Sequence, residues 1–302
     1  MPRKLTSNSL KIDIASVQRL LADAERYGDF IAKKTYINKL NQLNNELQSL
    51  EQEYITNACV GLFFDGDAVV GSKGILASFA GHSLESFQEL VNKVFAYNEN
   101  GSLGARGIIA NQTSSNLMIT GVAKGSFGFI LNELSDQMEL TETSLKITVD
   151  SVIELINDST LDDDSKFSLA IEKIDQRILQ SLKNFFITLD KGNTTLRIVG
   201  DKKEYKLGHN AISLARKRTE ATVINEEEKT KDLKLIGLLP ESCRFEAIDD
   251  TDLISGTVSK EAVQALQGKK LNSQIKVKMI TKVVKSISRQ EKVVYRISAV
   301  FK

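Results

Sequence analysis

Several residue types that build common active sites are scarce in this chain of 302 residues. Its two cysteines, Cys59 and Cys243, exclude a disulfide framework and a four-cysteine zinc site. Two histidines, His82 and His209, leave little material for histidine-based metal or triad chemistry. Tryptophan is absent, and there are only two prolines. We therefore expect no catalytic centre of a familiar kind, no metal and no bound cofactor.

Long apolar runs and an excess of one charge are also missing. No segment approaches the roughly eighteen apolar residues that a membrane-spanning helix needs. Met1-Pro2-Arg3-Lys4 leads into polar residues, which is not the pattern of a signal peptide. The net charge is only +1, so there is no global attraction to a polyanion or a membrane surface. These features predict a cytoplasmic protein without a membrane partner.

The near-zero net charge hides an uneven distribution. Residues 116–191 carry seven basic and thirteen acidic residues, whereas residues 269–302 carry ten basic residues and one acidic residue. An acidic middle and a basic tail are a hint about binding partners, which include the other half of the same chain.

The patterning predicts an α+β protein with three consecutive domains. These are a coiled-coil-like helical hairpin over residues 1–54, a central domain of β-hairpins and helices over 55–224, and a small β-rich module over 232–302. The charged segment 225–231, which has no apolar residue, is the best candidate for a linker or a solvent-facing turn.

Apolar residues recur at heptad spacing in both predicted N-terminal helices. The first helix contains Val17, Leu20, Ala24, Tyr27 and Ile31, and the second contains Tyr36, Leu40, Leu43, Leu47, Leu50 and Tyr54. So narrow an apolar seam packs against one partner helix, either within the chain or in another molecule. The candidate assembly residues are Leu40, Leu43, Leu47 and Leu50.

The central domain alternates between strand-like and helix-like periods. We expect β-hairpins at 59–70, 116–131 and 195–207, with turns at Asp65-Gly66, Ala123-Lys124-Gly125 and Gly200-Asp201. We expect helices from Ser83 to about residue 98, over 143–158, over 164–189 and from about residue 210 to 218.

The C-terminal module has the element order β-β-β-α-β-β. Strands are expected at 233–239, 243–248, 253–258, 273–284 and 292–301, with a helix at 260–266. This order is that of the OB fold, a five-stranded Greek-key barrel that often binds oligonucleotides, although an SH3-like barrel would produce a similar pattern.

Period-two alternation on the last two strands places basic residues on one exposed face. Odd-numbered residues from Ile275 to Val283 and from Val293 to Phe301 are expected to face the core. The exposed face lacks the aromatic rings of many single-strand binders, so solvated edge lysines are an alternative interpretation. The candidate polyanion contacts are Lys276, Lys278, Lys282, Lys285, Arg289, Lys292 and Arg296.

Other motifs favour structural roles. The glycine-rich segments 101–107 and 121–128 match neither GxxxxGK[ST] nor GxGxxG, and Asp162-Asp163-Asp164 fits the start of a helix better than a cation site. Cys59 and His209 have no recognisable catalytic partners.

These observations favour a non-catalytic binding or assembly protein that contacts a protein partner or its own copies through the heptad seam and the basic strands. The alternative is a nucleic-acid-binding protein that uses the C-terminal barrel, and a second alternative is an enzyme with scattered acid and base residues. The lysine-, asparagine- and isoleucine-rich composition suggests an accessory protein of a bacterial system, for example one for phage defence.

Overall fold

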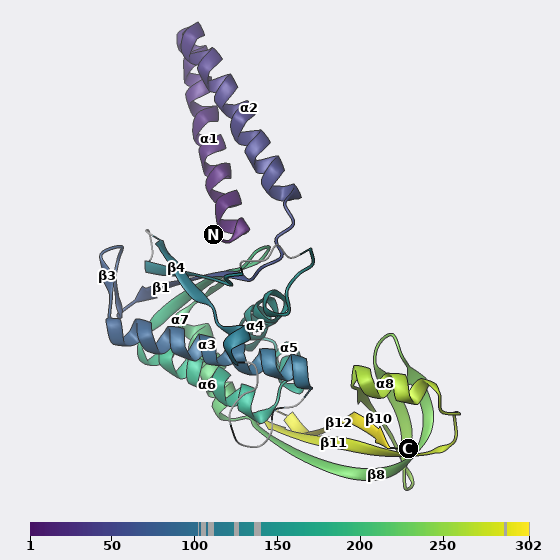
Figure 1. Cartoon of the computed structure of the whole chain (residues 1–302). Coiled ribbons are helices and arrows are strands. Elements are labelled where there is room, and N and C mark those ends of the chain that lie inside the picture. The colour runs from purple at the N-terminus through teal and green to yellow at the C-terminus, as the bar shows by residue number, and fades with distance from the viewer. Residues whose placement is uncertain are drawn as a thin grey trace. The chain divides into compact units, whose positions relative to one another are not determined.

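The computed structural model describes residues 1–101, 103, 107, 112–123, 127–135, 140–286 and 289–301. Helices and sheets in these residues confirm the mixed class, and a closed barrel forms the C-terminal end (Figure 1). The chain divides into two compact units. The predicted domains are consecutive, whereas these units interleave along the chain. The first unit holds residues 1–82, 113–157 and 191–209, and the second holds 83–112, 158–190 and 210–302.

Two long helices, α1 (Arg3–Tyr27) and α2 (Phe30–Gln52), lie side by side in the first unit (Figure 1). Gly28 ends α1 with φ 70°, a left-handed conformation that glycine adopts at low cost. The carboxylate of Asp29 then accepts hydrogen bonds from the backbone N–H groups of Ile31 and Ala32, which caps the start of α2. The predicted first helix, which extends to Ile31, was therefore wrong at its end.

The sides of α1 and α2 that are least exposed follow heptad spacing. The predicted Val17 and Ala24 lie in the seam of α1, but Leu20 is 46% exposed and Leu21 takes its place. On α2, Leu43 is buried, and the other three candidate assembly residues are half-buried. The seam residues are Ser7, Leu10, Ile14, Val17, Leu21 and Ala24 of α1 and Leu40, Leu43, Leu47 and Leu50 of α2.

The first unit contains a five-stranded antiparallel sheet with the order β4-β5-β1-β6-β7. The central strand β1 is an apolar run that is buried from Val60 to Phe64, as befits a strand with neighbours on both sides. The predicted hairpin across Asp65-Gly66 was wrong, because β1 pairs with β5 and β6. The strands are β1 (Cys59–Gly66), β4 (Met118–Ala123), β5 (Phe127–Asn132), β6 (Thr194–Val199) and β7 (Glu204–Leu207).

The remaining hairpins of this unit agree with the predictions in part. β4 pairs with β5 and β6 pairs with β7, as expected, but residues 124–126 of the first turn lie outside the described residues. Two short strands, β2 (Val69–Val70) and β3 (Gly74–Ile75), pair with each other. Helix α4 (Ser144–Thr160) forms as expected, with its first fourteen residues in this unit.

A buried ion network ties α1 to the end of β6. Arg3 binds the carboxylate of Asp201 through Nε at 3.0 Å and Nη2 at 3.1 Å. Lys146 of α4 lies 3.6 Å from Asp201 and 2.8 Å from Asp150, and its side chain is 3% exposed. Arg3 also donates to the backbone carbonyl of Glu53. This network holds both ends of the helix pair near the sheet.

Four helices that lie wholly or mostly in the second unit have boundaries that differ from the predicted ones. α3 begins at Ala77, so Ser83 lies inside the helix and does not cap it. The predicted helix over 164–189 is two helices, because the carboxylate of Asp175 accepts the N–H of Ile178 and starts a new helix there. The helices are α3 (Ala77–Asn100), α5 (Asp164–Glu172), α6 (Gln176–Lys191) and α7 (His209–Glu220).

The C-terminal barrel closes in the order β8-β9-β10-β12-β11, and its one parallel pairing joins β10 to β12. The predicted linker at 225–231 was wrong, because these residues belong to β8 and pair with residues 277–283 of β11. The elements are β8 (Val223–Leu239), β9 (Arg244–Asp249), β10 (Asp252–Val258), α8 (Lys260–Gln267), β11 (Gln274–Ser286) and β12 (Arg289–Phe301).

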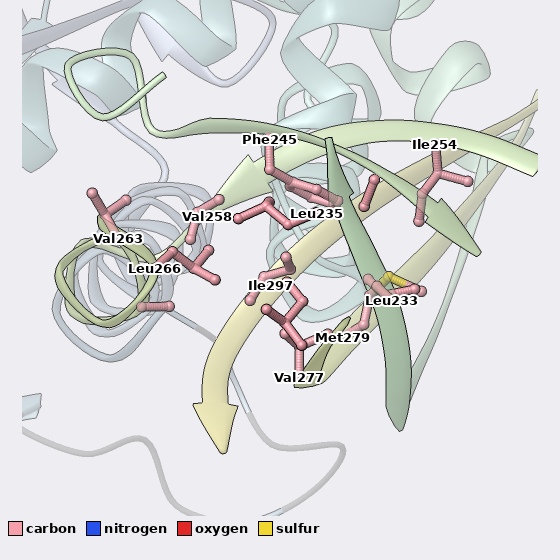
Figure 2. Close-up of a cluster of buried hydrophobic side chains, with 13 residues drawn as sticks. Leu233, Leu235, Phe245, Ile254, Val258, Val263, Leu266, Val277, Met279 and Ile297 are labelled. Carbon is pink, nitrogen blue, oxygen red and sulfur yellow. The ribbon is translucent and has the colours of Figure 1, made fainter. Parts of the chain in front are cut away.

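Side chains from all five strands and α8 fill the barrel (Figure 2). Ile275, Val277 and Met279 face this core as predicted. On β12, Tyr295 and Ile297 also face the core as predicted, but the alternation changes side after Ile297. Met279 pairs with Ile297 and Lys278 pairs with Ala299, so β12 has one extra residue between these two pairs. Val300 therefore packs against the core and Phe301 is 41% exposed, contrary to the prediction.

Candidate anion-binding site

A cavity of about 680 Å³ lies on the outer face of the barrel, entirely within the second unit. Its volume falls in the range of pockets that hold small molecules or nucleotides. The walls come from the end of α3, from α5 and from all five barrel strands. The lining includes Tyr97, Leu169, Glu172, Lys173, Glu226, Arg244, Ser255, Gly256, Thr257, Ile280, Lys282, Lys292, Val293, Val294 and Arg296.

The charge of this lining is predominantly positive. Glu172 and Glu226 are its two acidic residues. Five cationic residues outnumber them: Lys173, Arg244, Lys282, Lys292 and Arg296. Ser255 and Thr257 of β10 add hydroxyl groups, and Ile280 and Val293 add apolar surface. The cavity therefore suits an anion that has an apolar portion.

The environment of Lys282 differs from the one that the sequence analysis predicts. Its expected position on an exposed face was wrong, because its side chain is only 5% exposed. The alternation along β11 does direct Lys282 away from the barrel core, but the C-terminal end of α5 covers that part of the strand. Its Nζ donates to the backbone carbonyl of Glu172 at 2.6 Å and to that of Ile174.

The break between α5 and α6 makes these two carbonyls available. In a continuous helix the carbonyl of Ile174 would accept the N–H of Ile178, but that N–H binds the carboxylate of Asp175. The end of a helix carries partial negative charge, which attracts a cation. The amine of Lys282 therefore takes the place of the missing helical N–H donors.

Burial lowers the pKa of Lys282 to about 8, because an ammonium group loses much of its hydration there. The carboxylates of Glu226, Asp175 and Glu172 oppose this effect, and Arg296 adds to it. Burial also raises the pKa of Asp175, against its hydrogen bonds from the backbone N–H groups of Ile178 and Arg177. The strand and the helix break thus hold an unusually acidic ammonium beside the cavity.

Arg296 and Tyr97 meet at one wall of the cavity. The Arg296 guanidinium donates to the Tyr97 hydroxyl at 3.0 Å, and its carbon lies 5.5 Å from the ring centre. Burial raises the pKa of Tyr97, and the neighbouring Arg296 partly offsets that effect. Gly101, with φ 74°, leaves room for the guanidinium, since a Cβ atom there would lie 2.9 Å from it. The arginine is thus positioned by an aromatic ring.

The other predicted polyanion contacts are distributed over β11 and β12. Lys292 lies on the cavity and binds Glu172 at 2.6 Å. Lys278 binds Glu228 of β8 at 2.8 Å, and Lys285 binds Glu291 at 2.8 Å. Lys276 is exposed, opposite Asp232 in the ladder. The side chain of Arg289 lies outside the described part of the chain.

Three of the seven predicted contacts, Lys282, Lys292 and Arg296, therefore come together at one site. Lys173 and Arg244, which complete the cationic lining, were missed by the sequence analysis. Arg244 does carry a signal, since it precedes the core residue Phe245 in β9 and must point away from the core. Lys173 follows α5 without any recognisable pattern.

Comparisons of the chain with protein-family models, with curated proteins and with solved structures give no match. Among the described residues, no helix is both long enough and apolar enough to cross a membrane. Within the same residues, no group of three or more histidine, cysteine, aspartate or glutamate side chains is placed to hold a metal ion.

Proposed function

We propose that the chain binds single-stranded nucleic acid through the outer face of its C-terminal barrel. The observation that carries this proposal is the convergence of Lys173, Arg244, Lys282, Lys292 and Arg296 on one cavity. Phosphate groups supply most of the affinity of nucleic-acid complexes, and lysine and arginine are the residues that neutralise them.

The topology of the barrel supports the same proposal. Its strand order, its parallel β10–β12 pairing and the helix between β10 and β11 fit the OB fold better than an SH3-like barrel. OB folds bind oligonucleotides on the face of their second and third strands. Those strands are β9 and β10 here, and their residues Arg244, Ser255 and Thr257 line the cavity.

The lining also offers surfaces for a nucleobase. Bases of single strands stack on aromatic rings and on arginine guanidinium planes. Tyr97 and Arg296 provide both at one wall, and Leu169, Ile280 and Val293 provide apolar contacts. The exposed strand face was expected to lack aromatic rings, but Tyr97 of α3 contributes one from outside the barrel.

A salt titration with the full chain tests this function. Fluorescence anisotropy would measure the binding of a labelled single strand and of a duplex of equal length. Three or four phosphate contacts predict a slope of about −2 to −3 in a plot of log affinity against log salt. Affinity for the single strand should then fall about 20- to 50-fold between 50 and 200 mM salt. The proposal fails if neither oligonucleotide binds at 50 mM salt, or if binding does not weaken as the salt concentration rises.

A second candidate function, assembly through the N-terminal helices, is favoured by a separate observation. Tyr27, Phe30 and Ile31, where α1 meets α2, are each at least 78% exposed. The seam of Leu40, Leu43, Leu47 and Leu50 is at least half-buried within the chain, so these three exposed residues are better placed to contact a protein partner or a second copy. A cytoplasmic location and a coiled-coil character of the helix pair belong to this proposal.

Light scattering tests the second candidate. Phe30→Ser combined with Ile31→Ser should lower an oligomeric mass, or abolish capture of a partner, without unfolding the chain, because both side chains are exposed. Leu43→Asp is the comparison variant, since Leu43 is buried and its change should destabilise the helix pair itself. A monomeric wild-type chain that captures no partner would exclude assembly.

A further inference from the structure

The amine of Lys282 has a hydrogen-bonding arrangement that suits its neutral form. A neutral amine has two N–H groups and one lone pair, whereas an ammonium has three N–H groups. Nζ of Lys282 binds two acceptors, the carbonyl oxygens of Glu172 and Ile174. Both N–H groups of the neutral amine therefore have acceptors, and the side chain of Lys282 lines the cavity.

Charged groups face this amine from three directions. Glu226 lies directly opposite Lys282 in the β8–β11 ladder, so the two side chains share one face of the sheet. Asp175 and Glu172 approach from the break between α5 and α6, and Arg296 approaches from β12. Because burial outweighs the three carboxylates, a substantial fraction of Lys282 is neutral near pH 8. A desolvated lysine of this kind is a nucleophile toward carbonyl compounds.

We propose that Lys282 captures a phosphate-bearing aldehyde as an imine, with the phosphate held by the cationic residues of the cavity. This inference rests on the proposed function in one respect, since both place phosphate against the same cations. Three of these residues are exposed, unlike the buried Lys282: Lys173, Arg244 and Lys292. An aldehyde next to a phosphate occurs in sugar phosphates and in a deoxyribose of DNA that has lost its base.

The chemistry needs no oxidant, reductant or metal. The lone pair of Nζ attacks the carbonyl carbon, the nitrogen gives up one N–H proton, and the carbonyl oxygen takes a proton to give a carbinolamine. That oxygen then takes a second proton and leaves as water, while the nitrogen gives up its other N–H proton and the carbon–nitrogen double bond forms. The amine thereby releases its hydrogen bonds to the carbonyl oxygens of Glu172 and Ile174. Glu226 is the carboxyl group placed across the ladder to exchange protons during these steps. The net reaction joins an amine and an aldehyde and releases one water molecule.

Reductive trapping tests this proposal on the wild-type full chain. One arm uses pyridoxal 5′-phosphate, and the other uses a single-stranded oligonucleotide with one base-free deoxyribose. Sodium borohydride would reduce any imine, and peptide mass spectrometry would locate the modified lysine. We expect modification of Lys282 at pH 8 to be at least about tenfold faster than that of exposed lysines, whose ordinary pKa is near 10.4. The rate should rise with pH through about 8.

Lys276→Met is the matched control, because Lys276 is an exposed lysine on the same strand. It should leave trapping unchanged, whereas Lys282→Met should abolish it. The mass-spectrometric location in the wild-type chain decides the question even if Lys282→Met does not fold. Modification spread evenly over exposed lysines, or absent at Lys282 in both arms, would overturn the proposal.

The two arms separate this proposal from the proposed function. Trapping of the oligonucleotide at Lys282 supports both. Trapping of pyridoxal 5′-phosphate alone, with no binding of an intact oligonucleotide, supports imine formation with a small phosphorylated aldehyde and contradicts nucleic-acid binding. Binding of the intact oligonucleotide without any adduct at Lys282 leaves nucleic-acid binding in place and overturns imine formation.

Discussion

Lys282 lies directly opposite Glu226 across the β8–β11 ladder, at the point where β11 meets the end of α5. Next along the same ladder, Lys278 of β11 binds Glu228 of β8. Two acidic residues of β8 therefore face basic residues of β11, so part of the basic tail has partners within the chain itself. Lys282, Lys292 and Arg296 differ from the other tail cations because they also line the cavity.

The first prediction concerns the pH dependence of stability at Lys282. Its pKa is about 8 in the folded chain and 10.5 when unperturbed, so the unfolded chain binds more protons between these values. The free energy of unfolding should therefore rise with pH between 8 and 10.5, by on the order of 3 kcal/mol from this group. Below pH 8 both states bind the proton, and the contribution becomes constant.

Urea unfolding of the wild-type chain and of Lys282→Met at pH 7, 8, 9 and 10 measures this effect. The difference between the two proteins should change with pH only above about pH 8. Lys276→Met should follow the wild type throughout, because Lys276 is exposed. Parallel pH profiles for wild type and Lys282→Met would show that Lys282 is not held in a desolvated site.

The second prediction concerns the ion network at the base of the helix pair. Asp201 is 5% exposed and contacts both Arg3 and Lys146, so Asp201→Asn leaves two poorly hydrated cations without this carboxylate. We expect the free energy of unfolding to fall by about 3 kcal/mol. Hydrogen exchange in α1 should also become faster, since Arg3 belongs to that helix.

Glu154→Gln provides the comparison for this network. Glu154 binds Lys203, but both side chains are at least half exposed, so its loss should cost less than about 1 kcal/mol. Equal losses of stability in the two variants would contradict the view that burial distinguishes the Asp201 network.

The third prediction concerns closure of the barrel at Gly256. A Cβ atom at this position would lie 2.1 Å from the carbonyl oxygen of Tyr295, which is its partner in the parallel β10–β12 pairing. Gly256→Ala should therefore separate the two strands and lower the free energy of unfolding by about 1–3 kcal/mol. Oligonucleotide binding should weaken as well, because Gly256 lines the cavity.

Gly268→Ala is the control for Gly256→Ala. No atom lies within 4 Å of a Cβ atom at Gly268, and its φ of −83° suits alanine. The free energy of unfolding of Gly268→Ala should differ from that of the wild type by less than about 1 kcal/mol, and we expect a small increase. Similar destabilisation in both variants, measured by thermal unfolding, would mean that the strand contact is not the cause.

Much of the C-terminal barrel could be predicted because its signals are local. The alternation of Ile275, Val277 and Met279 identifies the core side of β11 correctly. The same alternation indicates only that Lys282 faces away from that core, and does not indicate that α5 covers it. Burial of Lys282 depends on a contact between segments more than a hundred residues apart, which no local period contains.

Two other errors have a common cause. The apolar spacing through Ile174 and Ile178 continues across the break between α5 and α6, so it conceals the cap formed by Asp175. The charged run at 225–231 resembles a solvent-facing linker only when it is considered alone. Complementary charges on β11 were available in the sequence and would have indicated the pairing of β8 with β11.

The central claim is that the cavity on the barrel binds single-stranded nucleic acid, and a matched pair of charge reversals tests it most directly. Arg244→Glu and Lys276→Glu change the net charge equally, and both residues are exposed, but only Arg244 lines the cavity. In fluorescence anisotropy at 50 mM salt, Arg244→Glu should weaken binding of a single strand at least about tenfold and make the salt slope shallower by about 0.7. Lys276→Glu should change the affinity less than about threefold. Equal effects of the two variants, or wild-type affinity in Arg244→Glu, would contradict binding at the cavity.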